Sequence, residues 1–368
     1  MKKFNNINVQ YLLNKKNIDK SISQVLNRSD FVMGKEVFSL EEKLKQFTKS
    51  KYCISVSSGT DALLISLMSI NIKHGDEVIT TSFSWISTAE VIVNLGAKPV
   101  FIDVDQNTGL IKEKLIEKMI TKKTKAIIIV SLFGQIPNIE FINLIGKKYK
   151  IPIIEDAAQS FGSKFKNKYS CNLTTIGCTS FFPTKNLGCY GDAGAIFTDN
   201  YKIQKACKQI RLNGKNNYGN FTRIGIQGRI DTLQASILIA KLKKFKKELK
   251  MRKDLAHNYV KLLNKKIPNA SIIGLNKSYN NSWPTFNILI KNRNKIKKFL
   301  EKNKIFTKIY YTKPMPLYYP YSKFKKTKIN DALKISKSIL SLPFGPYLKI
   351  QDQKKVINLM EEYINTYE

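Results

Sequence analysis

Short apolar runs alternate with longer segments of helical length, and this alternation limits the possible folds more than any other feature. The β-branched runs are DEVITTSF (76–83), KPVFIDVD (98–105), AIIIVSLFG (126–134) and IPIIEDAA (151–158), bounded by Gly, Pro or Asp. Strands buried on both faces of a parallel sheet read as nearly continuous apolar runs, with crossover helices between them. We therefore predict an α/β fold built on a mainly parallel sheet.

The C-terminal third no longer shows the alternation of short apolar runs with helical segments. A long amphipathic stretch over residues 229–266 predicts a connecting helix, and later segments such as WPTFNILI (283–290) indicate a smaller α+β region. At 368 residues the chain is long enough for two domains. We predict a large domain with an N-terminal arm over residues 1–245, and a small C-terminal domain over residues 246–368.

Charge and hydropathy narrow the class of protein. The formal net charge of +36 suggests nucleic acid, but the lysine runs have helical spacing and no RNA- or DNA-binding motif accompanies them. Solvated helix faces and attraction to small anionic substrates are the preferred readings. No apolar run approaches the ~20 residues of a membrane helix. Because the N-terminus lacks the apolar segment of a signal peptide, we predict a cytosolic protein that does not bind membranes.

Cysteine and histidine usage limits the chemistry. Five cysteines form no CxxC pair and predict reduced, mostly buried thiols. Two histidines leave little room for a His-based triad or a His metal cluster, so no metal site is predicted. Acid–base work then falls to lysine, carboxylate or tyrosine.

The segment SVSSGTDALLISL (55–67) reads as a strand that turns into a helix. Gly59 permits close backbone approach, and the helix N-terminus presents free N–H groups and a positive dipole end that suit a phosphate. Ordinary helix capping by Ser58 or Thr60 is the alternative.

Asp156 ends an apolar strand, and Lys185 follows 29 positions later within CTSFFPTKNLGCYGDAGAIFT (178–198). A lysine desolvated among aromatic residues has a depressed pKa and becomes nucleophilic toward an aldehyde. The alternatives are a structural helix cap for the aspartate and a snorkelling surface side chain for the lysine. The three glycines after Lys185 favour the first reading, because they imply backbone crowded against a bulky group.

A phosphate-binding helix start, a strand-end aspartate and a buried lysine together describe a pyridoxal phosphate site. The segments SSGTDAL, EDAAQSFG, SFFPTKNLG-YGDAGA and GRIDTLQASIL resemble the DegT/StrS family of nucleotide-sugar aminotransferases. The resemblance runs from about residue 30 to SLPFGPYL near the C-terminus. Within the family, SCNLTTIGCTSFFPTKNLGCYGDAGAIFT is most similar to the enzymes that aminate UDP-2-acetamido-2-deoxy-3-oxo-glucuronate.

This resemblance implies the fold type I aminotransferase architecture and a homodimer with active sites shared between subunits. It implies that Lys185 forms the Schiff base and shuttles protons, while Asp156 keeps the pyridine nitrogen protonated. The other implied cofactor contacts are Gly59, Thr60 and Ser180 to the phosphate, Trp85 stacked on the ring, Gln159 at the phenolic oxygen, and Gln227 from the partner subunit. Gln227 stands where the family usually has asparagine.

For the nucleotide sugar, the resemblance implies contacts from Ser29, Phe31, Thr184, Arg229, Tyr310 and Tyr311. Tyr310 replaces a histidine that is common in related sequences. The implied amino donor is L-glutamate, and the product would serve surface polysaccharide or lipopolysaccharide O-antigen synthesis. Three alternatives stay open: a 4-keto-6-deoxy sugar substrate, a non-catalytic PLP-binding regulator, and a lysine-rich nucleic-acid binder. The retained Lys185 argues against a PLP-dependent sugar dehydratase.

Overall fold

The computed structural model describes residues 7–276 and 278–367. Its α-helices are α1 (Ile7–Arg28), α2 (Lys35–Thr48), α3 (Gly59–Ser69), α4 (Ser87–Asn94), α5 (Ile116–Met119), α6 (Ile139–Tyr149), α7 (Tyr201–Arg211), α8 (Thr232–Lys266), α9 (Arg293–Lys302), α10 (Asn330–Ser338) and α11 (Ile350–Tyr367). Its strands are β1 (Tyr52–Val56), β2 (Glu77–Thr81), β3 (Lys98–Ile102), β4 (Thr124–Val130), β5 (Ile153–Asp156), β6 (Lys164–Phe165), β7 (Lys168–Tyr169), β8 (Ile176–Ser180), β9 (Gly194–Thr198), β10 (Ser271–Ile273), β11 (Phe286–Leu289) and β12 (Ile339–Leu342). Short 3₁₀ helices are η1 (Glu113–Leu115), η2 (Leu132–Gly134), η3 (Met315–Leu317) and η4 (Tyr319–Tyr321).

The large sheet has seven strands in the order β1-β9-β8-β5-β4-β2-β3 within the described chain. Neighbouring strands from β8 to β3 run parallel, whereas β9 pairs antiparallel with both β1 and β8. The predicted α/β fold with a mainly parallel sheet is confirmed. The four predicted runs contain β2, β3 and β5 in full and β4 from Ala126 onward.

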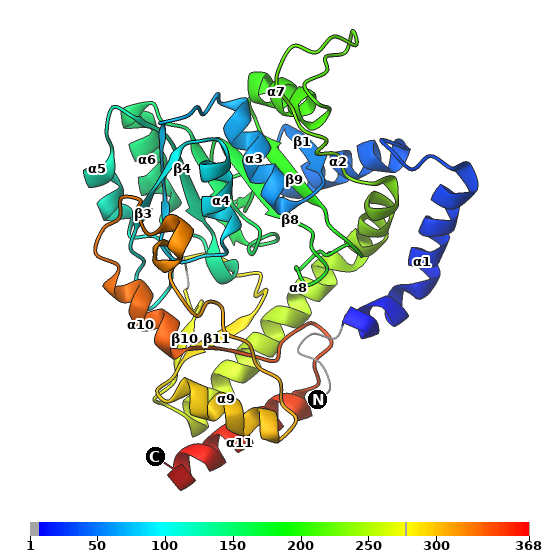
Figure 1. The fold of residues 1–368 in the computed structure, drawn as a ribbon. Helices are drawn as coiled ribbons and strands as arrows, with labels where there is room; N and C mark the ends of the chain where they lie inside the picture. The colour runs from blue at the N-terminus through cyan, green and yellow to red at the C-terminus, as the bar shows by residue number, and fades with distance from the viewer. Residues whose placement is uncertain (1–6, 277, 368) are drawn as a thin grey trace.

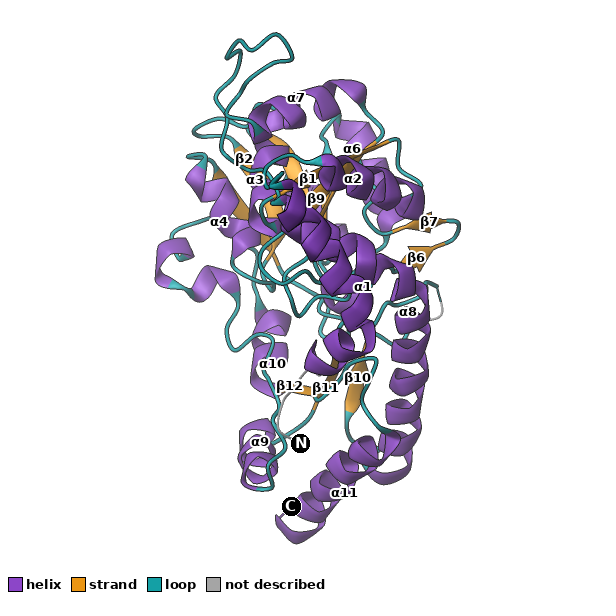
Figure 2. Cartoon of the chain, turned by 90° about the vertical axis from the view of Figure 1, so that its right-hand side faces the viewer, coloured by secondary structure: helices purple, strands orange, loops and turns teal. Residues whose placement is uncertain are grey.

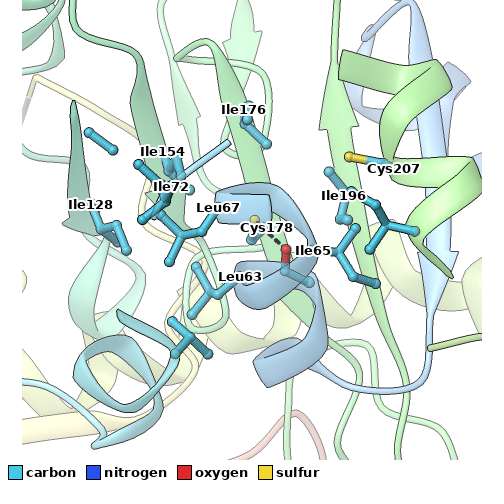
Figure 3. Close-up of a cluster of buried hydrophobic side chains, with 14 of the residues drawn as sticks. Leu63, Ile65, Leu67, Ile72, Ile128, Ile154, Ile176, Cys178, Ile196 and Cys207 are labelled. Carbon is cyan, nitrogen blue, oxygen red and sulfur yellow. Dashed lines mark hydrogen bonds between the residues drawn. The ribbon is translucent and has the colours of Figure 1, made fainter. Parts of the chain in front are cut away.

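Helices bury both faces of this sheet. On one face, Ile128 of β4 packs in a cluster with Leu63 and Leu67 of α3 (Figure 3). On the other face, Ile127 of β4 packs in a cluster with Ile142 of α6. Successive residues of one strand therefore face opposite apolar layers, which explains why the buried strands lack an apolar–polar alternation.

The C-terminal region surrounds a second sheet in the order β10-β11-β12, which is antiparallel throughout. Its core joins Tyr259 of α8, Ile296 of α9 and Ile357 of α11 to strand residues such as Phe286 of β11. The long helix α8 runs from the large sheet into this region (Figures 1 and 2). The predicted connecting helix is confirmed, whereas the domain boundary after residue 245 lies inside α8 and stays a prediction.

All five cysteines are buried and none forms a disulfide, as predicted. Within residues 7–276 and 278–367, no helix combines the length and the apolar character that a membrane span requires.

The parallel strands place the candidate site. Strands β1, β2, β4, β5 and β8 all end at the same edge of the large sheet, because each runs in the same direction. Loops at the carboxyl ends of parallel strands are where α/β folds bind ligands. The segments that begin at Ser57, Ser82, Ser131, Ala157 and Phe181 therefore converge there.

Candidate active site

Asp156 is the last residue of β5, and its carboxylate is buried with 6% of the residue exposed. Thr88 of α4 donates its hydroxyl to Oδ2 at 2.8 Å, and the Ala158 N–H donates to Oδ1 at 3.1 Å. Burial raises the pKa of Asp156, and these hydrogen bonds together with the charge of Lys185 oppose the rise. A buried carboxylate of this kind favours a cationic ligand group beside it.

Lys185 lies in the loop between β8 and β9 and is half-buried. The loop is closed by backbone bonds: the Lys185 N–H donates to Phe182 O at 2.9 Å and the Cys189 N–H to Phe181 O at 2.8 Å. Burial lowers the pKa of the Lys185 ammonium, while the charge of Asp156 opposes that effect. Lys185 therefore loses its proton at a lower pH than an exposed lysine and becomes available as a nucleophile or base.

Gln159 lies one turn beyond Asp156, and two contacts fix its amide. Its Oε1 accepts the Phe133 N–H at 3.1 Å, and its Nε2 donates to the Tyr311 hydroxyl at 2.8 Å. The Tyr311 ring is 6.2 Å from the ring of Trp85, which is 61% exposed. An aromatic surface and an amide are thus held beside the Asp156 carboxylate.

The start of α3 forms a tight cradle against the end of β8. Ser58 caps the helix by accepting the Asp61 N–H at 3.0 Å, so Ser58, one of the two predicted capping residues, is the cap. A Cβ atom on Gly59 would lie 2.6 Å from Cβ of Ser180. The Thr60 hydroxyl donates to Ser87 Oγ at 2.9 Å. Gly59, Thr60 and Ser180 are therefore neighbours at a helix N-terminus, which is a suitable arrangement for a phosphate.

We expect Gly59→Ala to weaken phosphate-ester binding and to lower stability. The added methyl must displace the Ser180 backbone or the first turn of α3, and overpacking of this kind costs about 1–3 kcal/mol. The free energy of unfolding in urea and the dissociation constant for pyridoxal phosphate should both show the loss, the latter rising ~10-fold.

Two further variants sharpen this test of the cradle. Ser180→Gly in the same chain removes the clashing Cβ and should restore the stability of the Gly59→Ala variant. Gly345→Ala is the matched control, because a Cβ atom there meets nothing within 4 Å. Equal losses in Gly59→Ala and Gly345→Ala would contradict the predicted close packing.

Four predicted residues lie apart from this group. Ser29 and Phe31 follow α1 and are exposed, as is Gln227, while Arg229 is half-buried. The Thr232 N–H donates to Phe31 O at 3.1 Å, which places Phe31 close to the start of α8. No hydrogen bond among the described residues joins these four side chains to Asp156 or Lys185.

The remaining two predicted contacts lie closer to the lysine. Thr184 is exposed and lines a cavity of about 30 Å³ together with Lys185 and Arg252. Tyr310 has its ring 5.8 Å from that of Tyr311.

The sequence reading missed Thr88, which holds Asp156 from a different helix. The resemblance implied only a sugar contact for Tyr311, whereas its hydroxyl also accepts a hydrogen bond from Gln159 Nε2 at 2.8 Å and so orients that amide. A signal for Thr88 was present, because TSFSWISTAE places it one helical turn after Trp85.

Comparisons with known proteins agree with this geometry. A model of the DegT/DnrJ/EryC1/StrS aminotransferase family matches residues 13–361. The UDP-2-acetamido-2-deoxy-3-oxo-D-glucuronate aminotransferase of Pseudomonas aeruginosa is 42% identical over 91% of this chain and 92% of its own.

Two solved structures extend the comparison. A DegT/DnrJ/EryC1/StrS aminotransferase from Brucella abortus has a TM-score of 0.94 and 32% identity, covering 98% of this chain and 99% of its own. NtdA from Bacillus subtilis, solved with its cofactor PMP bound, has a TM-score of 0.90 and 28% identity, covering 96% of this chain and 82% of its own.

Proposed function

From the premise that this chain belongs to the DegT/DnrJ/EryC1/StrS aminotransferase family, we propose that it aminates the 3-keto carbon of a UDP-linked 2-acetamido-2-deoxy-glucuronate. The protein is a pyridoxal phosphate-dependent sugar aminotransferase. The observation that carries the proposal is that buried Asp156 and half-buried Lys185 interact electrostatically at the carboxyl edge of the sheet. The position of the keto group comes from the 42% identical Pseudomonas relative, which is named for a 3-oxo sugar.

The residues at the sheet edge fit pyridoxal phosphate. The cradle of Gly59, Thr60 and Ser180 has no room for an added Cβ and suits the phosphate, while Asp156 supplies the buried anion that a protonated pyridine nitrogen requires. Exposed Trp85 offers a stacking face. When bound, the cofactor supplies an electron sink for the carbon that loses a proton.

The side chains of this chain then do three things. Asp156 would hold a proton on the pyridine nitrogen of the bound cofactor, and Thr88 holds Asp156 in place. Lys185 anchors the cofactor and carries a proton away from the α-carbon of the donor and toward the sugar carbon. Gln159 is oriented by Phe133 and Tyr311, and its amide would contact the phenolic oxygen of the cofactor.

We propose L-glutamate as the donor, with the nucleotide sugar held by Ser29, Phe31, Thr184, Arg229, Tyr310 and Tyr311. An aminated nucleotide sugar is a building block, and we propose its use in surface polysaccharide, including lipopolysaccharide O-antigen. The five buried, unpaired thiols support a reducing compartment, the cytosol.

We also propose a homodimer in which Gln227 reaches the site of the partner subunit. The segment 213–225 projects from the body beyond α7 (Figures 1 and 2). It exposes large apolar side chains: Tyr218 is 90%, Phe221 73% and Ile224 88% exposed. Apolar residues at the end of a projecting arm are suited to burial against a second copy.

The reaction itself tests the proposed function. We expect purified protein with pyridoxal phosphate to show a visible absorption band, and L-glutamate to convert that band to the spectrum of the pyridoxamine form. Adding the UDP-linked 3-keto uronate should restore the original band and yield the amino sugar. Restoration only by a 4-keto-6-deoxy sugar would reject the proposed substrate, and no response to any amino acid would favour a regulator that only binds the cofactor.

A further inference from the structure

Lys241 of α8 is a buried lysine beside the loop that carries Lys185. Only 2% of its surface is exposed, and its Nζ donates a hydrogen bond to the carbonyl oxygen of Gly188. The ammonium also lies 5.0 Å from the ring centroid of Tyr190. A buried cation is expensive unless its donors are used. Here its contacts lie on residues 188–190, the part of the loop that follows Lys185 and leads to β9.

The two sides of that loop, residues 181–183 before Lys185 and residues 188–190 after it, are packed tightly against each other. A Cβ atom on Gly188 would lie 2.5 Å from the carbonyl oxygen of Pro183. The Cys189 thiol donates to Phe181 O at 3.0 Å, which adds a side-chain bond between the two sides. Lys185 lies between Pro183 and Gly188 in sequence, so a displacement of Gly188 must move the segment that carries the lysine.

A second residue of α8 also binds the backbone of residues 188–190. Gln234 lies two helical turns before Lys241, and its Oε1 accepts the Tyr190 N–H at 2.9 Å. Helix α8 therefore binds this segment at two backbone groups, the carbonyl of Gly188 and the N–H of Tyr190. Both contacts go to backbone groups, which fixes the path of the loop whatever its side chains are.

We propose that Lys241 is a positioning residue for Lys185, which it serves by tying the Gly188 carbonyl to α8. This inference rests on the role of Lys185 proposed above. The proposed effect is mechanical, because burial and the charge of Asp156 act on the pKa of Lys185 whereas no charge of Lys241 does. An active-site lysine displaced by about 1 Å loses reactivity steeply, so a fixed loop has a direct chemical consequence.

The surroundings of Lys241 fit a group held for its donors. Burial lowers the pKa of Lys241 to about 8, with the charges of Glu248 and Cys189 opposing this and that of Arg252 adding to it. Glu248 is itself occupied, because its carboxylate accepts from Gln10 of α1 and from the Tyr347 hydroxyl, both at 2.7 Å. The phenol of Tyr190 lies near Tyr11 and Asp19 of α1. Protonated or neutral, the amine keeps an N–H for Gly188.

The test uses protein freed of cofactor and two readouts. The first is the rate at which pyridoxal phosphate and borohydride label Lys185, followed by mass spectrometry. The second is amide hydrogen exchange of residues 182–190. We expect Lys241→Met to slow labelling of Lys185 by ~10-fold and to speed exchange in this segment, because the apolar stem stays packed while the donor is lost.

Three variants complete the design. Lys241→Arg keeps a donor and should restore labelling to within about threefold of the parent chain. Lys247→Met changes an exposed lysine of the same helix and should leave both readouts unchanged. Should Lys241→Met fail to fold, Gln234→Leu removes the neighbouring tie and should show the same changes to a smaller extent.

Two results would overturn the positioning role: labelling of Lys185 in Lys241→Met at the parent rate with unchanged exchange, or a Lys241→Arg variant no better than Lys241→Met. Failure of the parent chain to label at Lys185 is a different outcome. It would reject the proposed function of Lys185 itself.

Discussion

Replacing Lys185 with alanine should remove catalysis while leaving the fold intact. The variant loses the group that anchors the cofactor and the group that moves the proton, and one positioned acid–base residue alone contributes about 10²–10⁴-fold. We expect kcat for amino transfer from L-glutamate to fall by at least ~10³-fold. The purified variant should also lack the covalent adduct that borohydride traps in the parent. Steady-state kinetics and mass spectrometry of the trapped protein measure the two effects.

The thermal midpoint of Lys185→Ala should stay close to that of the parent or rise. Burial lowers the pKa of Lys185, so the folded chain binds its proton less readily than the unfolded chain. Stability from this group is therefore lost as pH falls below the normal pKa of lysine, and alanine removes the penalty. Lys253→Ala, at an exposed position of α8, is the control. Normal turnover in Lys185→Ala would mean that another amine carries the chemistry.

Much of the fold could be predicted because the decisive signals are local. β2, β3 and β5 lie within apolar runs, and most of β4 does; these runs can be recognised without any knowledge of their neighbours. The position of β9 could not be predicted in this way, because it inserts antiparallel between β1 and β8. The β1–β9 pairing joins segments more than a hundred residues apart, and strand order of this kind depends on contacts that no single window contains.

The site residues also divide into those that local sequence identifies and those that depend on long-range contacts. Asp156 and Lys185 stand in short segments whose composition is unusual for this chain, so they could be selected from the sequence alone. The bond between Gln159 and Tyr311 spans 152 residues and needed the structure. Lys241 was hidden in a lysine-rich helix. Its burial does have a weak signal, since Phe245 and Glu248 lie four and seven positions later on the same helical face.

Replacing Asp156 with asparagine should lower kcat strongly while the free energy of unfolding gains on that of the parent as pH rises. A destabilising core mutation would instead lower the free energy of unfolding. The amide keeps the shape of the side chain, and its oxygen can still accept the Thr88 hydroxyl, but it carries no charge to hold a proton on the pyridine nitrogen. Loss of one preorganised electrostatic contact in an active site costs about 10²–10³ in kcat. We expect a fall of that size, with L-glutamate half-reaction rates measured by stopped-flow absorbance.

Stability should respond to pH in a direction fixed by the shifted pKa of Asp156. Because burial raises that pKa, the folded parent binds a proton that the unfolded chain releases, so its stability falls as pH rises above the usual value of 3.8. Asp156→Asn lacks this loss, and its unfolding free energy should therefore gain on the parent as pH rises above about 3.8. Asp254→Asn, at an exposed position of α8, should track the parent at every pH. The opposite result, a variant that loses stability relative to the parent as pH rises, would contradict this prediction. It would show that the fold stabilises the Asp156 anion, and that the charge contributes to stability.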